Sequence, residues 1–164
     1  MGRYSLSMKL QHELKRSVPF VSLQQETLLN FLRIGDQVDN RLSRFFREHD
    51  LTLSRFNVLR ALALAERPLT CGEIAERMIQ IVPAITSLVD QLEKRGLVSR
   101  ERSTEDRRVV HVTITPEGIK LSEETMVPLL DLEKQLLKKM TRAELKQLLE
   151  LLEKARGSLA DFDA

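Results

Sequence analysis

The chain is poor in cysteine and in aromatic residues, and each scarcity excludes a class of protein. The single cysteine, Cys71, cannot form an internal disulfide, so nothing in the sequence points to an oxidising compartment. Aromatic residues make up only 4% of the chain and tryptophan is absent, which argues against a stacking platform for single-stranded nucleic acid. No apolar run approaches the roughly 20 residues of a membrane span, and the N-terminal segment lacks the apolar core of a secretory signal. We therefore expect a cytoplasmic protein with no membrane partner.

Glycine-rich phosphate loops, nucleophile motifs and clustered metal ligands are also missing from the sequence. The histidines, His12, His49 and His111, are scattered, and no Cys/His spacing suits a metal ion. We therefore expect neither an enzyme nor a cofactor. Cys71 falls at a predicted helix N-terminus, where the helix dipole can activate a thiol for redox sensing, but we favour a buried structural thiol.

The residues that are present suit one ordinary domain, 1–164, with 42% hydrophobic and 30% charged residues. The 26 Lys and Arg residues nearly balance the 24 Asp and Glu residues, so the net charge of +2 indicates no particular partner. The cations are unevenly spread, because arginines crowd between Arg95 and Arg108. That region is the first candidate for a functional surface.

Apolar periodicity and capping residues predict helices over much of the first hundred residues. These helices are expected at 23–50, 52–67, 70–78 and 83–95. Thr52 is placed to cap the second helix, and Thr70 with Glu73 forms a capping box at the start of the third. Pro83 suits the first turn of the fourth helix, and Gly96 ends it.

After Gly96 the hydrophobic period changes from helical to two. Residues 97–102 and 108–114 alternate and are separated by a charged turn, which predicts a β-hairpin. Thr115 then caps another helix, in which Pro128 is expected to introduce a kink. A second capping box, at Thr141–Glu144, begins the final helix.

The terminal helices carry more leucine than a small central unit can cover. We therefore expect segments 20–50 and 116–164 to be dimerisation helices of a homodimer. The alternative is that these stripes form the core of a monomeric bundle.

The order helix, turn, helix and hairpin predicts a mainly α fold with a small β-hairpin wing, a winged helix-turn-helix over residues 51–115. Such units bind DNA by placing the second helix in the major groove. One face of the helix at 83–95 is apolar and the opposite face is polar. The candidate DNA-binding residues of this helix are Pro83, Ala84, Thr86, Ser87 and Gln91. An ordinary solvated helix face is the alternative.

Arginines at the hairpin tip supply the second group of candidate DNA contacts. Arg100, Arg102, Arg107 and Arg108 are placed to pair with phosphates or to enter a narrow minor groove. Asp106 is unfavourable next to phosphate, so we expect it to pair with Arg108 and fix the direction of that side chain. A simple surface salt bridge is the alternative.

Several runs of this sequence resemble the MarR (multiple antibiotic resistance regulator) family. These are Leu-Thr at 51–52 and 69–70, Glu-Ile-Ala at 73–75, Leu-Val-Asp-Gln-Leu-Glu-Lys-Arg-Gly-Leu-Val at 88–98, Asp-Arg-Arg at 106–108 and Ile-Thr-Pro-Glu-Gly at 114–118. Their combination over about 70 residues is far more specific than any single motif.

The resemblance implies a homodimer that binds a palindromic operator in double-stranded DNA, most often as a repressor. Many family members are released from DNA by a small-molecule effector bound between the dimerisation and DNA-binding parts, which here places the pocket where the first long helix meets the winged helix. By position, the resemblance makes Thr86, Ser87 and Gln91 recognition-helix contacts and Arg108 the wing arginine.

The sequence departs from the family pattern in the turn before the recognition helix. The family often has glycine at the position of Ile79, a capping serine near Ile81 and a long basic side chain at the position of Ser87. These departures predict weaker direct base readout and greater reliance on the wing and on DNA shape. The alternative function is a helical protein–protein interaction module in which the winged helix is only a scaffold.

Overall fold

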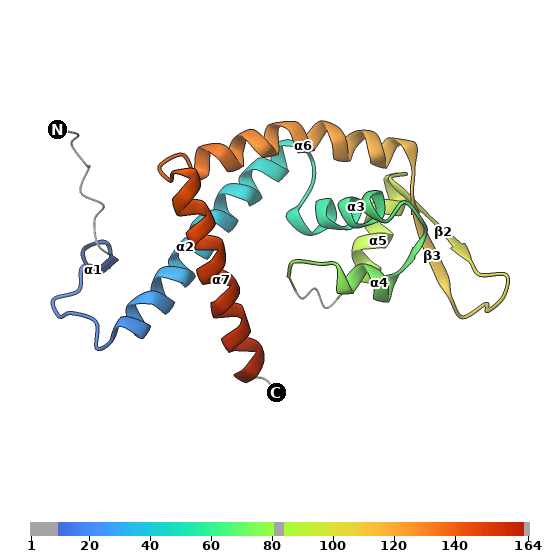
Figure 1. Cartoon of the computed structure of the whole chain (residues 1–164). Coiled ribbons are helices and arrows are strands. Elements are labelled where there is room, and N and C mark those ends of the chain that lie inside the picture. The colour runs from blue at the N-terminus through green and yellow to red at the C-terminus, as the bar shows by residue number, and fades with distance from the viewer. Residues whose placement is uncertain (1–9, 81–83, 163–164) are drawn as a thin grey trace.

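The computed structural model describes residues 10–80 and 84–162 and is mainly helical, with one small antiparallel sheet. Its elements are α1 (Leu10–Glu13), α2 (Leu23–Glu48), α3 (Leu53–Ala65), β1 (Leu69–Thr70), α4 (Cys71–Glu76), α5 (Ile85–Lys94), β2 (Val98–Arg102), β3 (Val110–Ile114), α6 (Pro116–Leu136) and α7 (Arg142–Phe162). Helices α3, α4 and α5 pack with the sheet at one end of the molecule, here called the winged unit (Figure 1). Helices α2 and α7 extend away from the winged unit, and α6 runs between the two parts.

Local capping fixes the start of most helices, as the sequence predicts. Thr52 Oγ1 accepts a hydrogen bond from the Arg55 N–H at 3.2 Å, and Thr115 Oγ1 accepts from the Gly118 N–H at 3.1 Å. At Thr70 and at Thr141 the reciprocal bonds of a capping box are both present. Helix α5 is followed by Gly96, whose φ of 69° lies in the left-handed region that glycine adopts without strain.

The sheet has three strands, in the order β1-β3-β2, whereas the sequence predicts a two-stranded hairpin. Strands β2 and β3 form the expected antiparallel pair, with Val98 opposite Ile114 and Arg102 opposite Val110. Strand β1 adds Leu69 opposite Val112 on the other edge of β3. A strand of two residues is too short for period-two alternation to reveal it, so only the pairing with β3 defines it.

Two helix boundaries differ from the sequence prediction. Helix α4 ends at Glu76 rather than near Met78, and the first described residue of the recognition helix α5 is Ile85 rather than Pro83. Pro83 and Ile81 lie outside the described residues. Helix α6 continues through Pro128 as a single element.

The hydrophobic core lies inside the winged unit and at its junctions with α2 and α6. Its fully buried side chains include Leu59, Leu62, Ile74, Val89, Leu92 and Val112. Phe46, near the end of α2, is 0% exposed and its ring lies 5.0 Å from that of Phe56 on α3. Leu129 contributes from α6. The core therefore fixes where α2 and α6 leave the winged unit.

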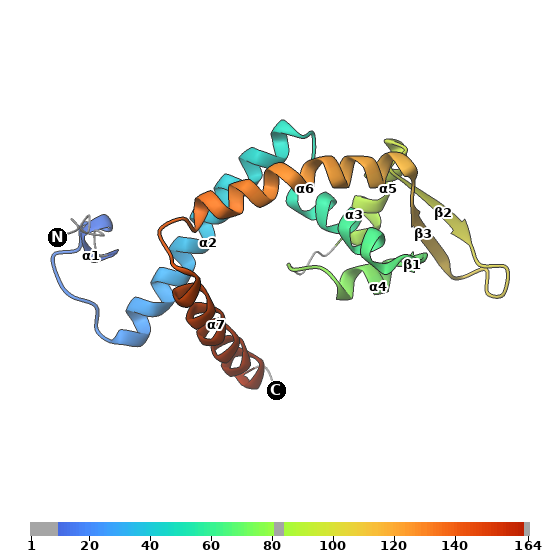
Figure 2. The ribbon, with the colours of Figure 1, turned by 45° about the horizontal axis from the view of Figure 1, so that its top comes forward.

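Beyond these junctions the long helices expose apolar residues. The exposed side chains that we call the arm surface are Leu28, Phe31 and Leu32 on α2 and Leu149, Leu152 and Leu159 on α7. Both helices project away from the core (Figure 2). In the described part of the chain, no helix combines the length and apolarity that a membrane span needs. Within residues 10–80 and 84–162, the side chains of the arm surface thus stay exposed.

Candidate nucleic-acid interface

Helix α5 buries one face and exposes the other, as its sequence predicts. Ile85, Val89 and Leu92 are buried in the winged unit, whereas Thr86 and Ser87 are exposed. Ala84 occupies the N-cap and provides no side-chain hydrogen bond, because it has no polar atom. The described start of α5 therefore has no polar side chain that caps it. Thr86 and Ser87 are available to an external partner.

Gln91 is part of a polar chain that crosses from α3 to α5. The Arg55 guanidinium donates to Gln91 Oε1 through Nε, at 3.0 Å, and through Nη2. Gln91 Nε2 in turn donates to Ser87 Oγ at 3.3 Å, one helical turn earlier. Sequence reasoning missed Arg55, because the position 36 residues before Gln91 carries no local signal of this contact. Arg55 of α3 thus holds Gln91 and, through it, contacts the position of Ser87 on α5.

Arg100 joins the wing to the recognition helix. Its guanidinium forms an ion pair with Asp90 and lies 3.5 Å from a Glu93 carboxylate oxygen. It also donates to the Thr86 backbone carbonyl at 3.0 Å. The sequence predicts Arg100 as a contact with phosphate, but in this structure both acids of α5 already neutralise its charge. Its geometry suits the positioning of the wing against α5.

The wing tip is organised by the side chains of Ser103 and Asp106, which accept hydrogen bonds from backbone N–H groups. Ser103 Oγ accepts from the N–H groups of Glu105 and Asp106, and Asp106 Oδ1 accepts from the Arg108 N–H at 2.9 Å. The expected pairing of Asp106 with the Arg108 guanidinium is therefore wrong, because the carboxylate binds the backbone instead. An Asp side chain that accepts from the N–H two residues on is a common way to fix a turn. Asp106 shapes the loop from which Arg108 projects.

Three wing arginines remain without an acidic partner among the described residues. Arg102 lies at the end of β2, and Arg107 and Arg108 lie in the loop before β3; all three are exposed. Arg102, Arg107 and Arg108 therefore present free guanidinium groups at the tip of the β2–β3 hairpin. This hairpin extends from the winged unit on the side away from α2 and α7 (Figure 1). Exposed, unpaired guanidinium groups suit the binding of phosphate.

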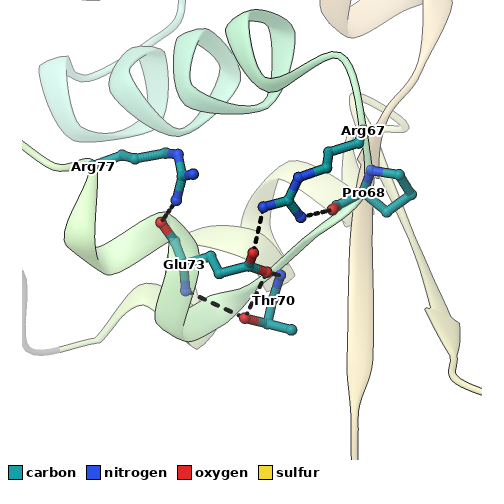
Figure 3. A network of polar contacts seen from close by, with 5 residues as sticks. All are labelled: Arg67, Pro68, Thr70, Glu73 and Arg77. Carbon is teal, nitrogen blue, oxygen red and sulfur yellow. Dashed lines mark hydrogen bonds and ion pairs between the residues drawn. The ribbon is translucent and has the colours of Figure 1, made fainter.

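Helix α4, which precedes the turn into α5, is fixed by the polar network in Figure 3. Glu73 accepts from the Thr70 N–H at 2.8 Å and from Arg67 Nη2 at 2.6 Å. These bonds, the Thr70 backbone contact foremost, lower the pKa of Glu73 from 4.5 to about 2. Arg77 donates to the Glu73 carbonyl at 2.6 Å. Cys71 is partly buried and packs against the core, which agrees with the structural interpretation of this thiol.

A cavity of about 510 Å³ lies where α2 and α6 meet α3 of the winged unit. Its apolar lining includes Leu42 and Phe46 of α2, Phe56 of α3, and Met126 and Leu129 of α6. Arg60 of α3 and Ile79 and Gln80 of the turn after α4 complete one side. No group of three or more potential metal ligands gathers anywhere within residues 10–80 and 84–162.

A family model, a curated relative and a solved structure all relate this chain to the same family of proteins. The model of the MarR family matches residues 51–110. The HTH-type transcriptional regulator PrsX of Escherichia coli is 30% identical over 117 residues, 70% of each chain. A MarR transcription factor from Planctomyces limnophilus is 34% identical, with a TM-score of 0.64 over 82% of this chain and 98% of that one.

A structure with bound DNA shares the same fold. Staphylococcus aureus MepR in complex with DNA has 24% identity and a TM-score of 0.72 over 79% of this chain and 96% of that one. Together, the family model, the relatives and the three-stranded winged unit show that the chain belongs to the MarR family of winged helix-turn-helix transcriptional regulators and is not an enzyme.

Proposed function

We propose that this protein is a cytoplasmic, homodimeric repressor that binds a palindromic operator in double-stranded DNA. In this proposal residues 51–115 bind DNA, and segments 20–50 and 116–164 form the dimer. The observation that carries it is that the winged unit exposes both the polar side chains of α5 and Arg102, Arg107 and Arg108, which have no acidic partner among the described residues. The sign of regulation rests on the resemblance to a family made up mostly of repressors.

The arm surface supports the dimer. Leu28, Leu32 and Leu159 are each more than half exposed. Monomeric soluble proteins rarely expose several large apolar side chains on one surface. A two-fold dimer would cover these residues and place two winged units side by side. Each α5 would then enter a major groove, with half-sites about 34–36 Å apart.

Within the same proposal, Thr86, Ser87 and Gln91 face base edges or phosphates, and Ala84 lies at the start of the helix in the groove. The wing arginines follow the flanking DNA backbone. Arg100 is assigned to positioning, since Asp90 and Glu93 already hold it. Asp106 sets the direction of the loop that carries Arg107 and Arg108. Greater reliance on the wing than on direct base contacts stays a prediction.

The cavity between α2, α3 and α6 supports release by a small, largely apolar effector. Its volume of about 510 Å³ suits a drug-sized molecule, and apolar side chains dominate its lining. Ile79 and Gln80 border the cavity and directly precede the segment leading to α5, so an occupant would touch the chain entering the recognition helix. Met126→Trp would fill the cavity; we expect it to retain DNA binding and to lose displacement by small apolar aromatic compounds.

The central test is a mobility-shift series on operator DNA selected from genomic fragments. We expect Arg107→Ala combined with Arg108→Ala to weaken binding and to lower the salt slope by up to about four, one for each phosphate contact that the two subunits of the dimer lose. Lys138→Ala combined with Lys139→Ala removes the same charge from the exposed turn between α6 and α7 and serves as the matched control. Unchanged affinity and slope in the wing variant would instead favour the interaction-module function.

A further inference from the structure

The contact between Arg55 and Gln91 has a consequence for base recognition that rests on the proposed DNA-binding function. A guanidinium group only donates hydrogen bonds, so the two bonds from Arg55 fix which end of the Gln91 amide is oxygen. Gln91 Oε1, the only side-chain acceptor of this residue, is therefore occupied from within the protein.

The nitrogen end of the same amide is directed along α5. Gln91 Nε2 donates one hydrogen to Ser87 Oγ at 3.3 Å, which leaves its second hydrogen free. Because Ser87 Oγ accepts this bond, its own hydrogen is free to donate elsewhere. Arg55 is partly buried and keeps N–H groups that are not used by Gln91. The three side chains thus offer donors to an external partner, while the Gln91 acceptor is engaged.

The major groove distinguishes bases by their pattern of donors and acceptors. A free glutamine pairs with adenine, because it accepts from the N6 amino group and donates to N7. Gln91 cannot make the first of these bonds while Arg55 holds its oxygen. Guanine presents two acceptors, O6 and N7, on the same edge, and these match the free donors of Gln91 Nε2 and the Ser87 hydroxyl.

We propose that Arg55 is a specificity-determining residue that makes the Arg55–Gln91–Ser87 chain a reader of guanine rather than adenine. Arg55 acts through Gln91: by holding Oε1 it sets which hydrogen-bonding groups α5 presents to a base. Thr86, on the same exposed face, has no part in this chain of bonds. The proposal therefore concerns the base position that Gln91 faces.

The test is selection of binding sites from a randomised duplex library by the full-length protein. Wild type, Arg55→Ala, Arg55→Lys, Gln91→Ala and Arg16→Ala are compared, and the position read by Gln91 is the one at which Gln91→Ala loses its preference. Wild type is expected to select guanine there. Arg55→Ala is expected to relax this choice or shift it to adenine, by about fivefold or more in relative affinity. Arg55→Lys keeps a donor toward Gln91 and is expected to retain guanine.

Arg16→Ala removes the same charge at a position outside residues 51–115 and outside the proposed dimer segments, and it is expected to select the wild-type site. Circular dichroism confirms that each variant is folded, and base identity is a readout that a loss of stability would not alter. If wild type enriches a site but Arg55→Ala selects the same base, the role of Arg55 is refuted while DNA binding stands. Adenine at this position in the wild-type site also refutes it. If wild type enriches no sequence, the proposed function itself fails.

Discussion

Replacement of Gly118 by alanine tests how closely the wing is tied to the long helix α6. Gly118 is buried in the first turn of α6. A Cβ atom added there would lie 2.1 Å from the Leu97 carbonyl oxygen and 2.8 Å from Ile114 Cγ1. The nearest neighbour is backbone, so no side-chain rotation relieves the contact. The two segments must separate by about 1 Å to reach a tolerable distance.

The cost follows from three contributions. Overpacking of this kind costs about 1–3 kcal/mol. Displacing Leu97 also weakens the bond from the Thr115 N–H to the Leu97 carbonyl, now 3.1 Å, and such a bond contributes about 1 kcal/mol. Alanine returns up to about 1 kcal/mol through its higher helix propensity. We therefore expect Gly118→Ala to lower the free energy of unfolding by about 2 kcal/mol.

Thermal and urea unfolding followed by circular dichroism measure this change at one fixed protein concentration, because a dimer makes the midpoint concentration-dependent. The expected shift in Tm is about 4–8 °C downward. Gly72→Ala is the matched control: a Cβ there meets nothing closer than Thr70 Oγ1 at 3.9 Å, so we expect no loss of stability. Equal midpoints for Gly118→Ala and wild type would refute the reasoning.

Four further predictions concern single side chains. The pKa of Glu73 is lowered to about 2. The ionised Glu73 carboxylate therefore stabilises the fold fully above about pH 4.5, and this stabilisation is lost as the pH falls toward 2. In urea unfolding between pH 5 and pH 3, Glu73→Gln should lose less stability than wild type. Ala84→Ser supplies the missing cap of α5 and should raise the free energy of unfolding by about 1 kcal/mol. Arg100→Ala should weaken operator binding without changing the salt slope in mobility shifts, whereas a slope lowered by about two, one for each subunit of the dimer, would place Arg100 on phosphate. Leu152→Glu on the arm surface should shift the protein toward monomer in sedimentation, and an unchanged mass would argue against this surface as the dimer interface.

Much of the fold could be predicted from the sequence because its signals are local. The caps at Thr52, Thr70, Thr115 and Thr141 act on N–H groups three residues away, so a linear pattern contains both partners of each bond. The change of period after Gly96 likewise marks the hairpin. The family resemblance depended on the same local runs and was confirmed by the comparisons.

The candidate site was predicted less completely. Sequence reasoning found the exposed Thr86 and Ser87 and the unpaired wing arginines, because helix periodicity and a charged turn reveal exposure. It paired Asp106 with the guanidinium of Arg108, whereas the carboxylate binds the backbone N–H of the same residue. Both groups are donors, and the composition of the turn does not distinguish between them. The contact between Arg55 and Gln91 could not be predicted from the sequence, because the two residues lie on different helices.

The sequence by itself determined where the helices begin, which faces are apolar and which family the chain resembles, because these depend on residues within a turn or two of each other. Only the tertiary structure decided that β1 joins the sheet, that Arg100 pairs with Asp90 rather than standing free, and that Arg55 holds Gln91. These contacts join separate elements, and the partner of a polar group across such a distance is set by packing. The same packing leaves the acceptor of Gln91 engaged and the guanidinium groups of Arg107 and Arg108 exposed.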